Sequence, residues 1–274
     1  MEIKTVKIGN IEIGQNKPLV LIAGPCVIES HESAKEHARL IKAIAIGAGI
    51  PYIFKASYDK ANRSSSDSFR GPGIEEGLEI LKDIKESIGV QVLSDVHSVK
   101  EIERAADVLD IIQIPAFLCR QTDLLLEAGR TGKAVNVKKG QFMSPQEMKN
   151  VVQKIESTGN HNILLTERGT TFGYNMLIND FRGIITMQEN GYPVVYDATH
   201  SVQMPGAKGT SSGGASEYVM PLSKAAVAVG CDAVFVEVHK DPEKALSDGP
   251  NMLKMDKLEE FLGEIRKIEK AVRS

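Results

Sequence analysis

Short, continuous apolar runs alternate along the chain with longer segments that mix apolar and charged residues. The runs lack the polar residue at every second position that a half-exposed strand would show, so they are typical of parallel strands covered on both faces. They recur at intervals of roughly 30 to 35 residues, as repeated strand–helix units do. Eight runs predict an α/β fold, a (β/α)8 TIM barrel: Leu19–Pro25, Tyr52–Ser57, Gln91–Val96, Ile111–Ala116, Ala134–Lys139, Ile163–Arg168, Pro193–His200 and Ala233–His239.

Signals for helix starts lie between these runs. Ser30 precedes an acidic first turn, and Ser144-Pro145-Gln146-Glu147 offers a capping residue followed by proline. The last helix is predicted over about Met255 to Val272. At the N-terminus apolar residues alternate about a Gly-Asn pair, which predicts a β-hairpin within residues 1–15 that covers the barrel bottom. We expect a single domain over residues 1–274.

Two connections are long and rich in turn-forming residues, Tyr58–Gly73 and Gln203–Ser216. Long loops in compact domains often carry function. Because an eighth strand follows the second connection, it predicts a mobile lid and not a domain boundary. It does not match a phosphate-binding P-loop, since no Gly-Lys-Ser/Thr triplet follows its first glycines.

Composition narrows the class of protein. The formal net charge is −3, which gives no general basic field for nucleic acid. No apolar stretch approaches the ~18 residues of a membrane helix, and the first residues lack the apolar core of a secretory signal. Three cysteines without CxxC spacing argue against a disulfide framework. We expect a soluble cytoplasmic protein that binds neither nucleic acid nor membrane.

Cations gather where the strands are expected to end, the edge at which barrels of this kind carry their active sites. Several cations in one partly dehydrated cavity favour a ligand with more than one phosphate or carboxylate. Salt bridges to Glu167 or Asp95 are the alternative. The cations are Lys55, Lys60, Arg63, Lys138, Lys139 and Arg168.

A thiol, an imidazole and two carboxylates lie near the ends of the first, seventh and eighth runs. Cys26 follows the first run, His200 ends the seventh, Glu237 lies in the eighth and Asp248 lies beyond it. Strands one, seven and eight are neighbours in a closed barrel, so the four side chains could bind a divalent transition metal. A single cysteine after a strand is also often a small buried hydrophobe. The residue pattern leaves both readings open.

Three motifs resemble the 3-deoxy-D-manno-octulosonate 8-phosphate synthases. They are Ile22-Ala23-Gly24-Pro25-Cys26-Val27-Ile28-Glu29-Ser30, Lys60-Ala61-Asn62-Arg63-Ser64-Ser65, and Glu237-Val238-His239 with Ser247-Asp248-Gly249-Pro250. The resemblance covers nearly the whole chain. The second motif separates this family from the related 3-deoxy-D-arabino-heptulosonate 7-phosphate synthases, which remain the nearest alternative.

The resemblance implies a transferase that condenses phosphoenolpyruvate with D-arabinose 5-phosphate for lipopolysaccharide biosynthesis. It implies a homotetramer in which Arg63 and Ser64 reach in from a neighbouring subunit. Cys26 indicates the metal-dependent branch, because the other branch carries asparagine there; zinc, iron, manganese and cobalt all suit the ligands. The implied catalytic residues are His200, Lys138 and Asp248, and the implied substrate contacts are Lys55, Lys60, Asn62, Arg63, Ser64, Asp95, Gln113, Ala116, Phe117, Lys138, Arg168 and Gln203.

Two further readings stay open from the residues. Lys55 or Lys138 could act as the amine of a Schiff-base aldolase, since neighbouring cations lower the pKa of an ammonium group. A barrel that binds phosphosugars without catalysis is the other reading.

Overall fold

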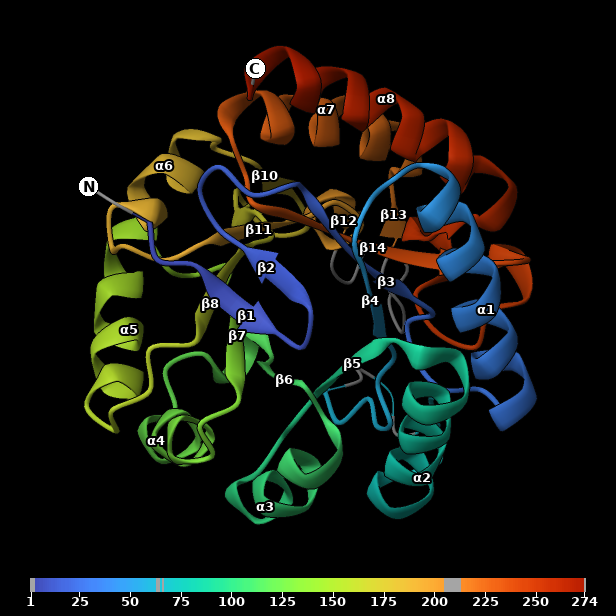
Figure 1. Ribbon diagram of the computed structural model, residues 1–274, viewed down its shortest axis with the longest axis horizontal. Coiled ribbons are helices and arrows are strands. Elements are labelled where there is room, and N and C mark those ends of the chain that lie inside the picture. Colours follow the sequence, from blue (N-terminus) through green and yellow to red (C-terminus); the bar gives the residue numbers. More distant parts are fainter. Residues whose placement is uncertain (1–2, 63–64, 66, 205–212, 274) are drawn as a thin grey trace.

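Parallel strands close into a barrel in the computed structural model, which describes residues 3–62, 65, 67–204 and 213–273 (Figure 1). Each barrel strand pairs in parallel with its neighbours, and β11 pairs with β14 to close the ring. The predicted TIM barrel is confirmed. Its eight strands are β3 (Val20–Gly24), β4 (Tyr52–Lys55), β5 (Gln91–Asp95), β6 (Ile111–Ile114), β7 (Ala134–Lys138), β8 (Ile163–Glu167), β11 (Val194–Asp197) and β14 (Ala233–His239).

Helices surround the strands (Figure 1). The predicted capping signals operate: Ser30 accepts the backbone N–H of Ser33 at 3.1 Å, and Ser144 and Glu147 form a capping box. No helix in the described part of the chain is long and apolar enough to cross a membrane. The helices are α1 (His31–Gly47), α2 (Ile74–Ile84), α3 (Val99–Val108), α4 (Thr122–Arg130), α5 (Met148–Glu156), α6 (Arg182–Gln188), α7 (Val219–Val229) and α8 (Leu258–Val272).

The predicted N-terminal hairpin is also confirmed. Strands β1 (Val6–Ile8) and β2 (Ile11–Ile13) pair antiparallel and lie across the near end of the barrel in Figure 1. Their apolar side chains join a buried cluster with interior residues from the lower part of the barrel, Ile22, Leu93 and Leu164 among them. The hairpin therefore seals the bottom of the barrel with apolar contacts.

Short strands extend the loops at the opposite end. They are β9 (Thr170–Thr171) with β10 (Leu177–Ile178), β12 (Gln203–Met204) with β13 (Gly213–Gly214), and β15 (Leu253–Lys254) beside β14. Several predicted runs extend beyond their strands, and the seventh does so the most: β11 ends at Asp197, and His200 lies in a 3₁₀ turn over His200–Val202. The backbone turns there because the Asp197 carboxylate accepts the backbone N–H of His200 at 3.0 Å.

Glu101 anchors the start of α3 beneath the rim of the barrel. Its carboxylate accepts the backbone N–H of His97 at 3.0 Å and the hydroxyls of Tyr58 and Ser98 at 2.7 and 2.9 Å. Burial acts to raise the pKa of Glu101, but the His97 side chain and the Tyr58 hydroxyl lower it to about 2. An ionised Glu101 therefore stabilises the folded state.

We predict that Glu101→Gln lowers the free energy of unfolding by about 2 kcal/mol at pH 7. It removes a carboxylate whose charge is stabilised more by hydrogen bonds in the folded protein than by water in the unfolded chain. The unfolded carboxylate protonates near pH ~4.3, so this stabilisation is present above that pH. The difference from the wild type should narrow as the pH falls from ~5 toward ~2, as measured by urea denaturation. Glu103→Gln, on an exposed position of the same helix, is the control. A difference that does not vary with pH would contradict this role.

Candidate active site

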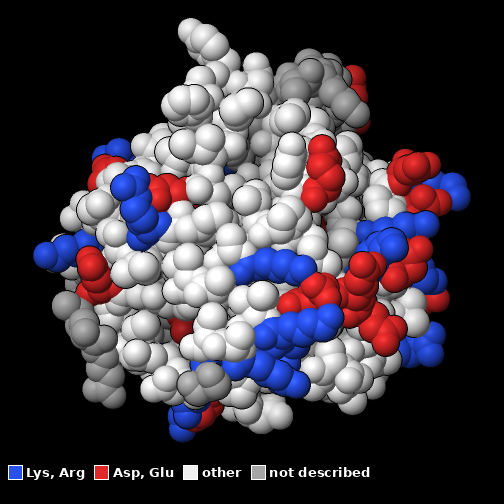
Figure 2. Space-filling view, turned by 90° about the horizontal axis from the view of Figure 1, so that it is seen from above, with Lys and Arg blue, Asp and Glu red and all other residues white. Residues whose placement is uncertain are grey.

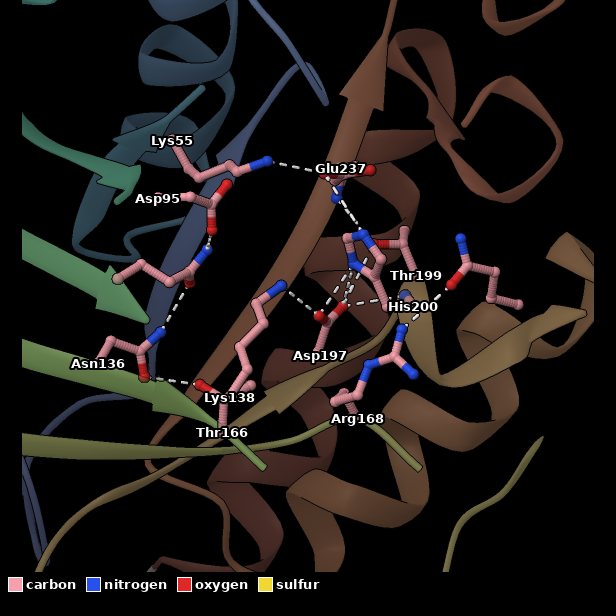
Figure 3. A network of polar contacts seen from close by, with 12 residues as sticks. Lys55, Asp95, Asn136, Lys138, Thr166, Arg168, Asp197, Thr199, His200 and Glu237 are labelled. Atoms are coloured by element: carbon pink, nitrogen blue, oxygen red, sulfur yellow. Dashed lines mark hydrogen bonds and ion pairs between the residues drawn. The ribbon is translucent and has the colours of Figure 1, made fainter. Parts of the chain in front are cut away.

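A cavity of about 1230 Å³ opens at the C-terminal ends of the barrel strands. Such a volume accommodates small-molecule substrates. The strands converge there, so residues far apart in sequence face one another (Figure 3). Predicted site residues that line the cavity are Lys55, Lys60, Asn62, Asp95, Ala116, Phe117, Lys138, Arg168, His200, Gln203 and Asp248.

Lys55, at the end of β4, is buried and pairs with Glu237 on β14. Its Nζ donates to Glu237 Oε1 at 2.8 Å and to the backbone carbonyl of Cys26 at 2.9 Å. Lys60 Nζ lies 3.9 Å from the same carboxylate oxygen. Burial acts to raise the pKa of Glu237, but Lys55, His200 and Lys60 lower it to about 2. Glu237 is therefore an anion in the wall of the cavity.

Asp197 joins the second cation, Lys138, to His200. The Asp197 carboxylate is fully buried, accepts from Lys138 Nζ at 2.6 Å, and lies 2.9 Å from His200 Nδ1. His200 and Lys138 hold the pKa of Asp197 well below its usual range despite burial. Sequence analysis missed Asp197, although it ends β11 just as Lys138 ends β7. The pairing aims the other imidazole nitrogen, Nε2, toward Glu237 at 3.7 Å (Figure 3).

Arg168, which follows β8, differs from these lysines. It is 4% exposed, and its Nη2 donates to the amide oxygen of Gln203 at 3.1 Å. Its Nη1 is buried and has no hydrogen-bond partner among the described residues. A buried guanidinium group with an unsatisfied donor is costly unless an anion joins it. Arg168 therefore points to an anionic ligand in the cavity.

The alternative of structural salt bridges holds for Lys139. This side chain is fully buried, and its Nζ lies 3.4 Å from Glu167 and 3.0 Å from the hydroxyl of Thr170. Lys139 does not line the cavity. It joins the end of β7 to the loop after β8.

Asp95 ends β5 at the floor of the cavity. Its oxygens accept from Gln113 Nε2 and from the hydroxyl of Ser57. Lys55, Lys60 and Lys138 lower the pKa of Asp95 against the effect of burial. Gln113 itself is fully buried beneath the cavity and does not line it. An ionised Asp95 can accept a hydrogen bond from a hydroxyl group of a ligand in the cavity.

The predicted metal ligands come together in part. Donor atoms of Cys26, Glu237 and Asp248 all lie within 4.8 Å of one another, while His200 lies beside this group, facing Glu237. Cys26 Sγ is 2.9 Å from Ser247 Oγ and 3.2 Å from Asp248 Oδ2. Burial, with Asp248 and Glu237 nearby, raises the pKa of the Cys26 thiol to about 12.

One atom tests whether these residues fit a metal ion. Glu237 Oε2 is buried and has no hydrogen-bond partner in the described part of the chain. A buried carboxylate oxygen normally accepts a hydrogen bond or binds a cation. With a thiol and a second carboxylate beside it, the group fits a divalent transition ion.

Some predicted residues lie outside the described part of the chain. Arg63 and Ser64 are among them, and so is the central part of the predicted lid, residues 205–212. The described ends of that segment form the β12–β13 pair. Asn62, just before the gap, is exposed and lines the cavity.

The outer surface over α7 and α8 carries charges of both signs. Lys and Arg side chains alternate there with Asp and Glu (Figure 2). Glu264 of α8, for example, pairs with both Lys224 and Lys267. The cations at the barrel mouth are therefore a local feature and do not continue a basic surface over this face.

Comparison with known proteins gives consistent matches over the full length. Residues 2–274 match the model of the DAHP synthetase I family. A "2-dehydro-3-deoxyphosphooctonate aldolase" of Geotalea daltonii is 56% identical over 271 residues, which cover 99% of this chain and 100% of the relative. A protein of the same name from Geobacter sulfurreducens is 57% identical over 270 residues, covering 98% and 99%.

Proposed function

The chain belongs to the DAHP synthetase I family, and on this basis we propose that it is a 3-deoxy-D-manno-octulosonate 8-phosphate synthase, the activity also named 2-dehydro-3-deoxyphosphooctonate aldolase. It is an enzyme that forms a carbon–carbon bond. Phosphoenolpyruvate, D-arabinose 5-phosphate and water give the eight-carbon sugar acid phosphate and free phosphate.

The observation that carries this function is the buried, partly unsatisfied guanidinium of Arg168 in the cavity wall. A phosphate would supply the missing acceptor with charge-assisted hydrogen bonds. Lys138 lies on the adjacent strand β7, so the same anion can meet both cations. We assign the phosphate of phosphoenolpyruvate to Arg168, Lys138, Lys55 and the backbone at Ala116, with Phe117 beside it and Lys60 at the carboxylate. Gln113, which the resemblance places at this phosphate, is fully buried and does not line the cavity, and its amide donates to Asp95.

We assign the sugar phosphate to the side of the cavity that Asn62 and Asp95 line. Asp95, an acceptor at neutral pH, suits the hydroxyls of arabinose 5-phosphate. The family resemblance adds Arg63 and Ser64 from a neighbouring subunit at the sugar phosphate, within a homotetramer. Gln203, which holds Arg168, completes the rim.

We infer that Cys26, His200, Glu237 and Asp248 would hold a divalent transition ion, the identity of which the donor set leaves among zinc, iron, manganese and cobalt. When bound there, such an ion supplies an electrophilic centre that orients the aldehyde group of the sugar. The Asp197 carboxylate holds the Nδ1 side of His200, which presents Nε2 to the ligand group.

The cations around the phosphate support the chemistry of phosphoenolpyruvate. Its vinyl carbon attacks the aldehyde carbon, positive charge develops at the enol carbon, and water adds there. The tetrahedral intermediate then loses phosphate by carbon–oxygen cleavage. Lys138 and Arg168 stabilise the departing phosphate, while His200 and Asp248 transfer the proton lost by the attacking water to the alkoxide formed from the aldehyde oxygen.

A Schiff-base aldolase is the second candidate, because burial lowers the pKa of Lys138 below its ordinary value. The neighbouring Asp197 opposes this by stabilising the ammonium form. An amine held protonated by a carboxylate 2.6 Å away is a poor nucleophile. The ion pair therefore favours phosphate binding by Lys138.

We predict phosphate release from phosphoenolpyruvate with arabinose 5-phosphate, at a kcat/KM at least about 100-fold above that with erythrose 4-phosphate, because binding groups at a missing hydroxyl would stay unpaired. Steady-state phosphate assays with both sugars measure the ratio. A preference for erythrose 4-phosphate would assign the chain to the heptulosonate synthases. A covalent adduct trapped by borohydride on Lys138 or Lys55 would favour the Schiff-base mechanism.

We predict that Cys26→Ala weakens metal binding by at least about 100-fold, because it removes the thiolate donor from the ligand group. Elemental analysis of purified protein and a chelator titration measure the loss. Cys231→Ala, which removes a buried thiol outside the group, should keep its metal. Full activity after exhaustive chelation would exclude a metal role in the reaction.

A further inference from the structure

A layer of polar side chains crosses the barrel interior between its apolar bottom and its charged mouth. The bottom layer packs against the hairpin. Strands β5, β6, β7 and β8 contribute Leu93, Ile111, Ala134 and Leu164 to it. Residues two positions further along each strand point into the barrel again. These residues, which we name the polar ladder, are Asp95, Gln113, Asn136 and Thr166.

Hydrogen bonds join the ladder in one direction. Thr166 Oγ1 donates to Asn136 Oδ1 at 2.7 Å, Asn136 Nδ2 donates to Gln113 Oε1 at 2.9 Å, and Gln113 Nε2 donates to Asp95 Oδ1 at 2.5 Å. Figure 3 shows the ladder running from Thr166 past Asn136 up to Asp95, to the left of Lys138. It ends at the carboxylate that faces the cavity.

The direction of the hydrogen bonds in the ladder follows from the acceptor at its end, Asp95. Asp95 is ionised and can only accept, so the amide of Gln113 must present its NH₂ group to it. The Gln113 carbonyl then needs a donor, which Asn136 provides, and the Asn136 carbonyl needs the Thr166 hydroxyl. Reversing either amide would set two acceptors or two donors against each other at buried positions.

Burial separates the ladder from direct contact with a ligand. Thr166, Asn136 and Gln113 are fully buried and do not line the cavity, while Asp95 lines it and is 8% exposed. Interior layers of such barrels are usually filled by branched apolar side chains. A buried polar series is costly unless every member is satisfied, so stability alone favours apolar residues at these positions.

We propose that Asn136 and Thr166 are positioning residues. Through Gln113, they orient Asp95 to accept a hydrogen bond from a hydroxyl group of the sugar substrate. This inference rests on the proposed function, since it names the sugar as the ligand of Asp95. Ser57 holds the second Asp95 oxygen from the end of β4, so the carboxylate is fixed from two sides. Loss of the ladder should then impair the sugar and spare phosphoenolpyruvate.

The test compares wild type, Thr166→Val, Thr166→Ser and Asn136→Asp by steady-state kinetics with arabinose 5-phosphate and by calorimetric binding of phosphoenolpyruvate. Thr166→Val keeps the side-chain shape but removes the donor, and should lower kcat/KM for arabinose 5-phosphate by about tenfold. Thr166→Ser keeps the hydroxyl and should stay within about twofold of wild type. Asn136→Asp removes the donor to Gln113 and should cost about 100-fold.

Phosphoenolpyruvate binding separates positioning from general damage. Lys138 lies two residues beyond Asn136 at the end of β7, and Arg168 lies two residues beyond Thr166, just after β8. A distorted barrel would therefore weaken phosphoenolpyruvate binding as much as sugar binding. Unchanged phosphoenolpyruvate affinity with impaired use of the sugar supports the proposal. Parallel losses, a variant that does not fold, or unaffected kinetics in Thr166→Val and Asn136→Asp would overturn it. A wild-type protein inactive with arabinose 5-phosphate would contradict the proposed function itself, and the ladder's role with it.

Discussion

Pairing of β14 with both β3 and β11 is the contact on which the site depends. It closes the barrel, and closure places the ends of the first, seventh and eighth barrel strands side by side. Cys26, His200 and Glu237 therefore meet, although more than 170 positions separate the first two in the chain. An open sheet with the same strands would leave the thiol at one edge and the imidazole at the other.

Charge balance explains how so many ionised groups stay buried at one end of a barrel. Lys55 is compensated by Glu237 and Lys138 by Asp197, each at hydrogen-bonding distance. Unpaired charges at this depth would cost several kcal/mol each. Arg168 departs from this pattern, because Gln203 satisfies only part of its guanidinium. Among the described residues, Arg168 thus has a buried donor that an anionic ligand would satisfy.

The interior of the barrel is organised in layers that divide stability from function. The hairpin and the lowest side chains form an apolar seal, the polar ladder lies above them, and the ionised groups lie at the mouth. Strand β7 contributes to all three layers through alternate residues, namely Ala134, Asn136 and Lys138.

The sequence by itself determined the barrel, the hairpin and most of the residues at the mouth, because continuous apolar runs and the polar residues that end them are local patterns. It could not determine which charges pair. Glu237 pairs with Lys55 and also lies beside Cys26 and Asp248. Asp197 pairs with both Lys138 and His200. Nor did it predict the turn that carries His200 beyond its strand, or the direction of the ladder beneath Asp95. Those features depend on distances between strands that are remote in the chain, and only closure of the barrel sets them.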